Sequence, residues 1–443
     1  MTLLSCEAEE PDYPIWMRLR WLPLRLPKDP AERQDMTKRT PQKIRNLATF
    51  EHLFAAYGET GAMVFSVAAR IGSVVPKAEF VKALSTVQAR HPLLRASIGW
   101  DEDGVHAFAG SENPIPLTVM SGQEIQWHHV AQDEVNRPFR AADGPLIRLV
   151  ALSGAAETTV VLTFHHSVAD GQAALFVMHE MLVALSGGRF VDTPSADVLD
   201  ERLGMQLPRF PRNARRDDAD PLAASSDLSQ DARPKAAVKV IDLQEAFTEK
   251  LVHAAKSHGA TVNSMLTAAL GRAQMSLDSR WKRETLRVMS PIDFKPVLSI
   301  PDQVGVFLSI AITPFEQGER EFWAEANRVG QQIDKFRSTE MASRIVGDLA
   351  KRFADDVSYD ASRERIVRQI PYDTVMTNLG LVRLPARYGD LAVERVWAPV
   401  LRSVPGEDVI AAATFGGVLS LVQTSVGGTE GLLDRMVEIL NDL

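Results

Sequence analysis

An apolar run that leads directly into two histidines and then a helix is the feature that most constrains this chain. Residues 160–164 are apolar and mostly β-branched, which is typical of a buried strand. The motif His165-His166-Ser167-Val168-Ala169-Asp170-Gly171 follows, and residues 172–186 are apolar enough for a buried helix. From the residue frequencies of this chain, His-His-x-x-x-Asp-Gly has a chance occurrence of roughly one in a thousand. The pattern predicts a rigid strand-to-helix junction that carries functional side chains.

The residue types of this motif favour proton transfer. Neighbouring residues of a strand point to opposite faces, so only one of His165 and His166 can face a given cavity. The other histidine should pack or form hydrogen bonds within the protein. A neutral imidazole accepts a proton near pH 7, as acyl transfer to an alcohol or amine requires. Asp170 either orients the histidine directly or braces the loop by pairing with a distant cation. Gly171 gives freedom in φ and permits close backbone approach.

Other chemistries find less support. A metal site would need further ligands, and no His, Cys or carboxylate stands at convincing spacing. The pair His128-His129 has no Asp-Gly after it and is interpreted as an ordinary histidine pair. Neither a Gly-x-Ser-x-Gly elbow nor a Walker loop occurs in the sequence.

Composition limits the partners and the compartment. A net charge of −8 disfavours nucleic acid and anionic lipid as partners. Cys6 is the single cysteine, so no internal disulfide can form and a reducing compartment fits. The N-terminal residues do not have the pattern of a signal peptide, and no apolar run approaches the length of a membrane helix. We therefore expect a cytoplasmic protein without an integral membrane segment.

The chain is predicted to contain two domains, because 443 residues exceed the size of one hydrophobic core. Prolines and scattered charges suggest an N-terminal extension at 1–45 and a linker at 201–237. The first subdomain, which carries the motif, then spans 46–200, and the second spans 238–443. Strands and helices alternate irregularly in both, so the predicted class is α+β.

The predicted elements follow from periodicity and turn residues. Strands are expected at 63–71, 94–100, 105–109, 145–152, 158–165, 284–292, 305–313, 374–379, 391–397 and 419–425. Helices are expected at 76–90, 172–186, 243–258, 261–277, 320–335 and 429–440.

His-His-x-x-x-Asp-Gly resembles the signature of the chloramphenicol-acetyltransferase-like superfamily. That superfamily includes nonribosomal-peptide condensation domains and the phthiocerol/phthiodiolone dimycocerosyl transferases. Further segments resemble the family in the same order along the chain: Arg90-His91-Pro92-Leu93-Leu94-Arg95, Arg137-Pro138-Phe139, Gly144-Pro145-Leu146-Ile147-Arg148 and Gly259-Ala260-Thr261-Val262-Asn263. The segments Thr377-Asn378-Leu379-Gly380, Tyr388-Gly389 and Thr414-Phe415-Gly416-Gly417 look most like the mycocerosyl transferase branch. The resemblance covers about residues 46–443.

The resemblance implies two chloramphenicol-acetyltransferase-like subdomains in a V, with a tunnel between them and the motif at its midpoint. His166 would be the catalytic base, and His165, Asp170 and Gly171 would be structural. In the family the aspartate pairs with an arginine across the interface. This sequence has Lys295 at that position. Lysine keeps the positive charge of arginine but lacks its planar guanidinium group, which can form two parallel hydrogen bonds with a carboxylate. Asn378 would contact the acyl group or the oxyanion.

The expected function is acyl transfer from a carrier-protein or coenzyme A thioester to a hydroxyl or an amine, in secondary-metabolite or lipid biosynthesis. No cofactor is expected to be bound, and phosphopantetheine would enter as part of the donor. The expected partners are an acyl or peptidyl carrier protein and a small-molecule acceptor, and the expected state is a monomer. The alternatives are a free-standing condensation enzyme joining two carrier-bound intermediates, a non-catalytic carrier or ligand binder, and a thioesterase-like hydrolase. The Asp-Phe-Gly-Trp-Gly motif of the plant branch is absent, which disfavours a plant-type enzyme.

Overall fold

The structure, a computed structural model, describes residues 42–122, 125–190, 196–210, 234–316, 318, 320–354 and 370–443. Contacts divide the chain into Met1–Gln42 and Lys43–Leu443, and the description below concerns the second unit. Of the predicted extension only residues 42–45 lie within the described part, and residues 211–233 of the predicted linker lie outside it. The division into 46–200 and 238–443 stays a prediction.

A seven-stranded sheet contains the motif strand. Its order is β12-β13-β2-β7-β6-β5, with β14 pairing beside β13 on β2. All its pairs are antiparallel except β5 with β6. The strands are β2 (Val64–Ile71), β5 (Leu117–Ser121), β6 (Ile147–Ser153), β7 (Thr158–His165), β12 (Arg387–Tyr388), β13 (Leu391–Val396) and β14 (Val400–Arg402). β7 is buried along its whole length, which is why its sequence is apolar rather than alternating.

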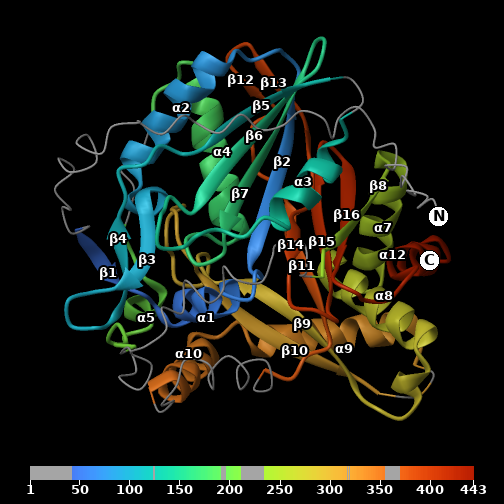
Figure 1. Cartoon of the computed structure of the whole chain (residues 1–443). Helices are drawn as coiled ribbons and strands as arrows, with labels where there is room; N and C mark the ends of the chain where they lie inside the picture. Colours follow the sequence, from blue (N-terminus) through green and yellow to red (C-terminus); the bar gives the residue numbers. More distant parts are fainter. Residues whose placement is uncertain are drawn as a thin grey trace, which may run out of the picture. The chain divides into compact units, whose positions relative to one another are not determined.

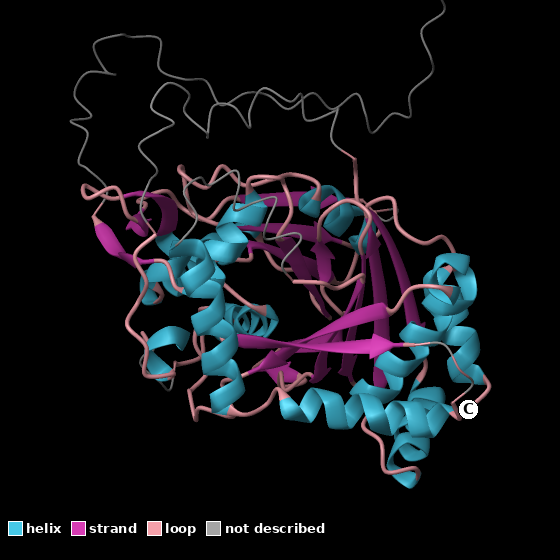
Figure 2. Cartoon of the chain, turned by 90° about the horizontal axis from the view of Figure 1, so that it is seen from below, coloured by secondary structure: helices cyan, strands magenta, loops and turns pink. Residues whose placement is uncertain are grey.

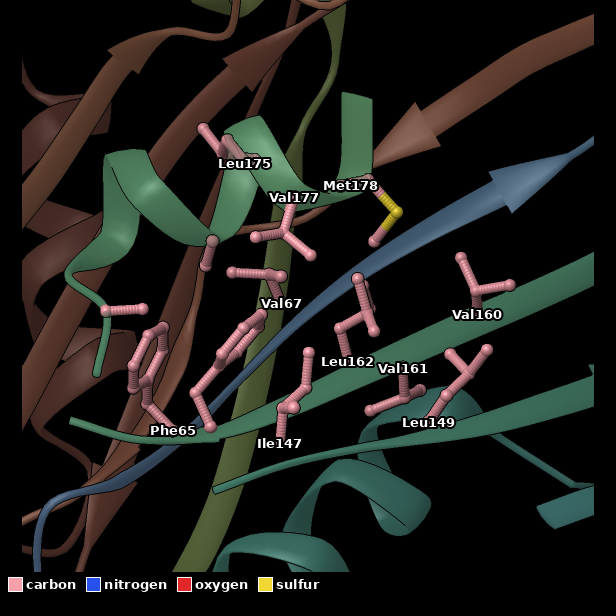
Figure 3. Close-up of a cluster of buried hydrophobic side chains, with 14 of the residues drawn as sticks. Phe65, Val67, Ile147, Leu149, Val160, Val161, Leu162, Leu175, Val177 and Met178 are labelled. Carbon is pink, nitrogen blue, oxygen red and sulfur yellow. The ribbon is translucent and has the colours of Figure 1, made fainter. Parts of the chain in front are cut away.

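Helices α2 (Lys77–Arg90) and α4 (Gly171–Leu185) lie side by side against this sheet (Figure 1). Helix α3 (Trp127–Val135) contacts β2 and β7 as well. Figure 3 shows how the apolar side chains of α4 lie next to those of β2, β6 and β7. Burying such a side chain is worth about 1.5–3 kcal/mol, so this contact fixes the start of α4 relative to the end of β7.

A six-stranded sheet has the order β10-β9-β11-β15-β16-β8. β11 runs parallel to β9 and β15, and the other pairs are antiparallel. The strands are β8 (Ala237–Leu243), β9 (Leu286–Asp293), β10 (Leu308–Phe315), β11 (Thr374–Leu381), β15 (Asp408–Phe415) and β16 (Val418–Ser425). Its helices are α7 (Glu245–Ser257), α8 (Val262–Leu277), α9 (Phe322–Lys335) and α12 (Leu432–Asn441). Figure 2 shows helices along the outside of the strands.

The remaining described elements are short or peripheral. A three-stranded sheet has the order β1-β4-β3, with β1 (Lys43–Asn46), β3 (Ala96–Trp100) and β4 (His106–Gly110). The helices outside the two large sets are α1 (Thr49–Gly58), η2 (Pro92–Arg95), α5 (Leu199–Arg202), η5 (Ser279–Lys282) and α10 (Thr339–Ala354). None of the helices in the described ranges has the length and apolar character needed to cross a membrane.

The two halves of the chain exchange elements. Strands β12, β13 and β14 come from the C-terminal half, yet they extend the first sheet through β2. Helix α1 comes from the N-terminal half, yet Phe50, Leu53 and Tyr57 pack in the core that surrounds α8 and the second sheet. This exchange explains why Lys43–Leu443 forms one compact unit. The predicted α+β class is confirmed.

Candidate active site

The junction between β7 and α4 is held from three directions. The backbone N–H of His166 donates to the carbonyl of Met63 at 2.8 Å, just before β2. The hydroxyl of Ser167 donates to the carbonyl of Glu51 at 2.9 Å, in α1. The N–H of Val168 donates to the carbonyl of His165 at 3.1 Å and closes a turn. These bonds fix the backbone from which the motif side chains project.

His165 is enclosed in the protein interior. Its side chain is 3% exposed, and its Nδ1 accepts a hydrogen bond from the N–H of Ser167 at 3.2 Å. Gly58, at the end of α1, lies so close that a Cβ there would clash with Nε2 of the ring. Burial lowers the pKa of His165 to about 3, so the ring is neutral at pH 7. These contacts suit the structural role predicted for this histidine.

His166 is only half-buried and lines a cavity. Its ring lies between Phe54 and Phe65, with centroid distances of 4.3 and 4.8 Å. Nδ1 is buried and has no hydrogen-bond partner among the described residues, so Nε2 is the ring nitrogen available to the cavity. Burial lowers the pKa of His166, while the charge of Asp170 and the backbone of His166 and Ala169 act in the opposite direction. The ring is therefore neutral at pH 7 and can accept a proton.

Asp170 joins the two halves of the chain through backbone groups. Its Oδ1 accepts from the N–H of Ala173 at 2.8 Å and caps α4. Its Oδ2 accepts from the N–H of Phe307 at 2.9 Å, and its own N–H donates to the carbonyl of Gly305 at 3.0 Å. Both oxygens are thus committed to N–H donors. Asp170 makes no hydrogen bond to His166. Among the described residues, the alternative in which Asp170 orients the ring of His166 directly is therefore not seen.

The predicted ion pair between Asp170 and Lys295 is wrong. Among the described residues Lys295 forms an ion pair with Asp302, at 4.0 Å, and its Nζ is buried without a hydrogen-bond partner. Lys295 is 2% exposed and follows the end of β9. Two backbone N–H groups stabilise the carboxylate of Asp170 in place of a cation. Asp170 does connect the N-terminal and C-terminal halves of the chain, but it does so through the backbone of Gly305 and Phe307 and not through Lys295.

Gly171 serves close approach and does not use its freedom in φ. A Cβ at this position would lie 2.6 Å from Cδ2 of Leu379, on β11, and the φ of Gly171 is not positive. The side-chain amide of the next residue, Gln172, donates to the carbonyl of Leu379 at 3.1 Å. The start of α4 is therefore packed directly on β11, which brings Asn378 to the same place.

The cavity at this junction has a volume of about 90 Å³. Its walls come from β2, the start of α4, β9, β10, β11 and β14 with the residue preceding it: Phe65, His166, Asp170, Gly171, Gln172, Pro291, Ile292, Asp293, Leu308, Thr377, Asn378, Leu379, Pro399 and Leu401. The structure thus brings His166, Asp170, Gly171 and Asn378 together in one cavity wall, while His165 and Lys295 lie outside it. The carboxylate of Asp293 was not predicted as a site residue.

Asn378 presents a hydrogen-bond donor to this cavity. Its Oδ1 accepts from the N–H of Gly380 at 2.8 Å, which leaves the Nδ2 group for the cavity. Asn378 lies near the end of β11, where the strand pairs with β15 through Ala412. Among the described residues no cluster of His, Cys, Asp and Glu has the composition to hold a metal ion. The cavity therefore offers an imidazole base, an amide donor and a carboxylate.

Comparison with known proteins agrees with this geometry. Residues 232–423 match the family model described as phthiocerol/phthiodiolone dimycocerosyl transferase C-terminus. No curated protein matches the sequence. The matched residues include β9, β11 and Asn378, which form one side of the cavity.

Solved structures extend the likeness to most of the chain. Polyketide synthase associated protein 5 from Mycobacterium tuberculosis has a TM-score of 0.61 at 16% identity, covering 90% of this chain and 98% of that chain. The first condensation domain of the CDA synthetase gives 0.62 at 14%, with 90% and 95% covered. TRI3 trichothecene 15-O-acetyltransferase from Fusarium sporotrichioides gives 0.61 at 13%, with 89% and 94% covered. The chain therefore has the fold of these three proteins, and its residues 232–423 match the phthiocerol/phthiodiolone dimycocerosyl transferase family, as the resemblance in its sequence predicted.

Proposed function

We propose that this protein is an acyltransferase that moves an acyl group from a phosphopantetheine thioester to a hydroxyl or an amine, with His166 as general base. The observation that carries the proposal is the neutral, half-buried ring of His166, which lines the cavity while its Nδ1 is buried. The family matched by residues 232–423 and the relatives of the same fold are acyltransferases or condensation domains. The thioester belongs to a carrier protein or to coenzyme A.

The proposed reaction has two proton transfers. Nε2 of His166 takes the proton from the acceptor as its oxygen or nitrogen attacks the thioester carbonyl. The negative charge that develops on the carbonyl oxygen is stabilised by the Nδ2 group of Asn378. The carbon–sulfur bond then breaks, and His166 returns its proton to the departing thiolate. Phe54 and Phe65 restrict the ring throughout, so its orientation needs no adjustment between the two steps.

The proposal is tested by incubating the protein with acyl-coenzyme A or acyl-loaded carrier protein and a panel of alcohols and amines. Mass spectrometry identifies the products. An ester or amide supports acyl transfer, and product formed only from two carrier-bound partners indicates a condensation enzyme. Free acid alone indicates a hydrolase. Binding without any product indicates a non-catalytic relative and contradicts the proposal.

The pH dependence of turnover follows from the environment of His166. Burial lowers its pKa below the ordinary value near 6.5, so the base form persists into mildly acidic solution. We expect kcat/KM to be level at neutral pH and to fall about tenfold per unit once the pH drops below that lowered pKa. An acid limb centred above pH 6.5 would contradict this assignment. Circular dichroism at each pH separates loss of the base from loss of the fold.

Acid should also weaken the fold itself. His106 and His165 both have pKa values lowered to about 3 by burial, against about 6.5 in the unfolded chain. Below pH 6.5 the unfolded state therefore binds more protons, so stability is complete above that pH and is lost as the pH falls toward 3. Urea unfolding at pH 7.5, 6 and 5 should show a steady decrease in the free energy of unfolding. Equal stability at all three would disprove the neutral burial of these rings.

A further inference from the structure

Asp293 is a carboxylate in the cavity that the proposed reaction does not use. It ends β9, is half-buried, and lines the same cavity as His166 and Asn378. Its Oδ1 accepts from the backbone N–H of Lys295 at 3.0 Å. Its Oδ2 receives no hydrogen bond from any described residue. One oxygen of Asp293 is thus fixed, and the other is open to a ligand.

The charges around Asp293 do not balance. Asp170 lies near it, but both oxygens of Asp170 are committed to backbone N–H groups. The ammonium group of Lys295 forms its ion pair with Asp302, at 4.0 Å. Burial and the charge of Asp170 raise the pKa of Asp293, and Lys295 offsets this only in part. The cavity therefore contains a carboxylate with an incomplete counter-charge, which a cation would supply.

We infer that Asp293 binds a cationic group of the acceptor, so that the preferred acceptors are amino alcohols or diamines rather than neutral alcohols. The cation cannot be the attacking atom, because a protonated amine has no lone pair to attack the thioester. The acceptor would instead place its hydroxyl or neutral amine at Nε2 of His166 and a second, protonated nitrogen at Oδ2 of Asp293. This inference rests on the proposed function and adds the acceptor class to it.

The test compares Asp293→Asn with wild type on matched acceptors. The amide keeps an oxygen for the N–H of Lys295 and removes the charge. Linear amino alcohols are paired with n-alkanols of the same number of heavy atoms, with one acyl thioester as donor. Wild type should prefer the amino alcohol, and Asp293→Asn should lower kcat/KM for it by about 10–100-fold, mainly through KM, with little change for the alkanol.

Asp348→Asn is the matched control. It removes one negative charge from an exposed position on α10 that does not line the cavity. It should leave the preference for amino alcohols unchanged. If Asp293→Asn lowers turnover of both acceptors equally, Asp293 is a structural residue and the inference is overturned.

A second measurement does not depend on turnover. Ligand-detected NMR follows the binding of n-alkylammonium ions to wild type and to Asp293→Asn. Binding that is lost in the variant supports the cation site even if no acyl transfer is found, in which case only the proposed function fails. Acyl transfer by wild type with no preference for cationic acceptors, and alkylammonium binding unaffected by the variant, overturns the inference and leaves the proposed function intact.

Discussion

Replacing His166 with glutamine is expected to lower kcat/KM by roughly 10²–10⁴-fold, the usual contribution of a positioned general base. Glutamine has a similar volume and keeps the contacts with Phe54 and Phe65, but it cannot accept a proton at neutral pH. The melting temperature should change little, because Nδ1 of His166 makes no hydrogen bond that the substitution could break. Steady-state kinetics and a melting curve of the same preparation decide the result.

His129→Gln is the control for this substitution. His129 is an exposed histidine on α3 and does not line the cavity, so its replacement should leave kcat/KM unchanged. The acid limb of the pH profile should disappear in the His166 variant and persist in the control. Near-full activity of His166→Gln would mean that another group accepts the proton.

Replacing Asp170 with alanine is expected to destabilise the protein by about 2–5 kcal/mol. The substitution leaves the buried N–H groups of Ala173 and Phe307 without acceptors, at about 1–3 kcal/mol each. The bond to Ala173 is the cap of α4, so the loss of the cap is already included in that figure. Activity should fall as well, because the contact with Phe307 holds the start of α4 against the other half of the chain. Urea unfolding monitored by circular dichroism measures the effect on stability.

Lys295→Met tests the corrected partner of Asp170. Methionine fills the space of the buried lysine stem. The weak contact with Asp302 and a partial counter-charge to Asp293 are lost, but a buried ammonium without a hydrogen-bond partner is removed as well, so stability should change by less than about 1 kcal/mol. Because Asp170 and Lys295 do not pair, the losses in the double variant should add. A double variant more stable than the sum of the singles would show that the two charges interact after all.

The sequence predicted the motif junction well because its signals are local. The predicted strand 158–165 coincides with β7, whose β-branched residues are buried on both faces. The predicted helix 172–186 differs by one residue at each end from α4, because Asp170 caps the helix at Gly171. The opposite placement of His165 and His166 followed from strand alternation alone.

Several elements were not predicted, among them α1, α3, α10, β5, β8 and β15. β15 contains three consecutive alanines, which favour a helix by propensity, and it becomes a strand only because β11 and β16 pair with both its edges. α10 did carry a signal, since Ala342, Val346, Leu349 and Phe353 are buried at helical spacing. The predicted helix 320–335 ends before α10 begins, and no predicted element covers residues 339–354.

The partners of the site residues depend on contacts between distant parts of the chain. The bond from Phe307 to Asp170 joins residues 137 positions apart, and no local pattern reveals which backbone N–H will reach the carboxylate. Asp293 stands two residues before Lys295, so the sequence pointed to the right segment and the wrong side chain. The pairing of β9 with β10 and β11 determines where β9 ends, and therefore which of the two side chains lines the cavity.

The strand exchange has a consequence for how the protein is made. β2 leaves the ribosome long before its partners β13 and β14, which lie far later in the chain. One edge of β2 therefore stays unpaired until β13 and β14 have been synthesised, and unpaired edges invite association with other chains. The first sheet is therefore completed only after β13 and β14 have been synthesised, so yield in a heterologous host should depend on chaperone supply and growth temperature as well as on the stability of the finished fold.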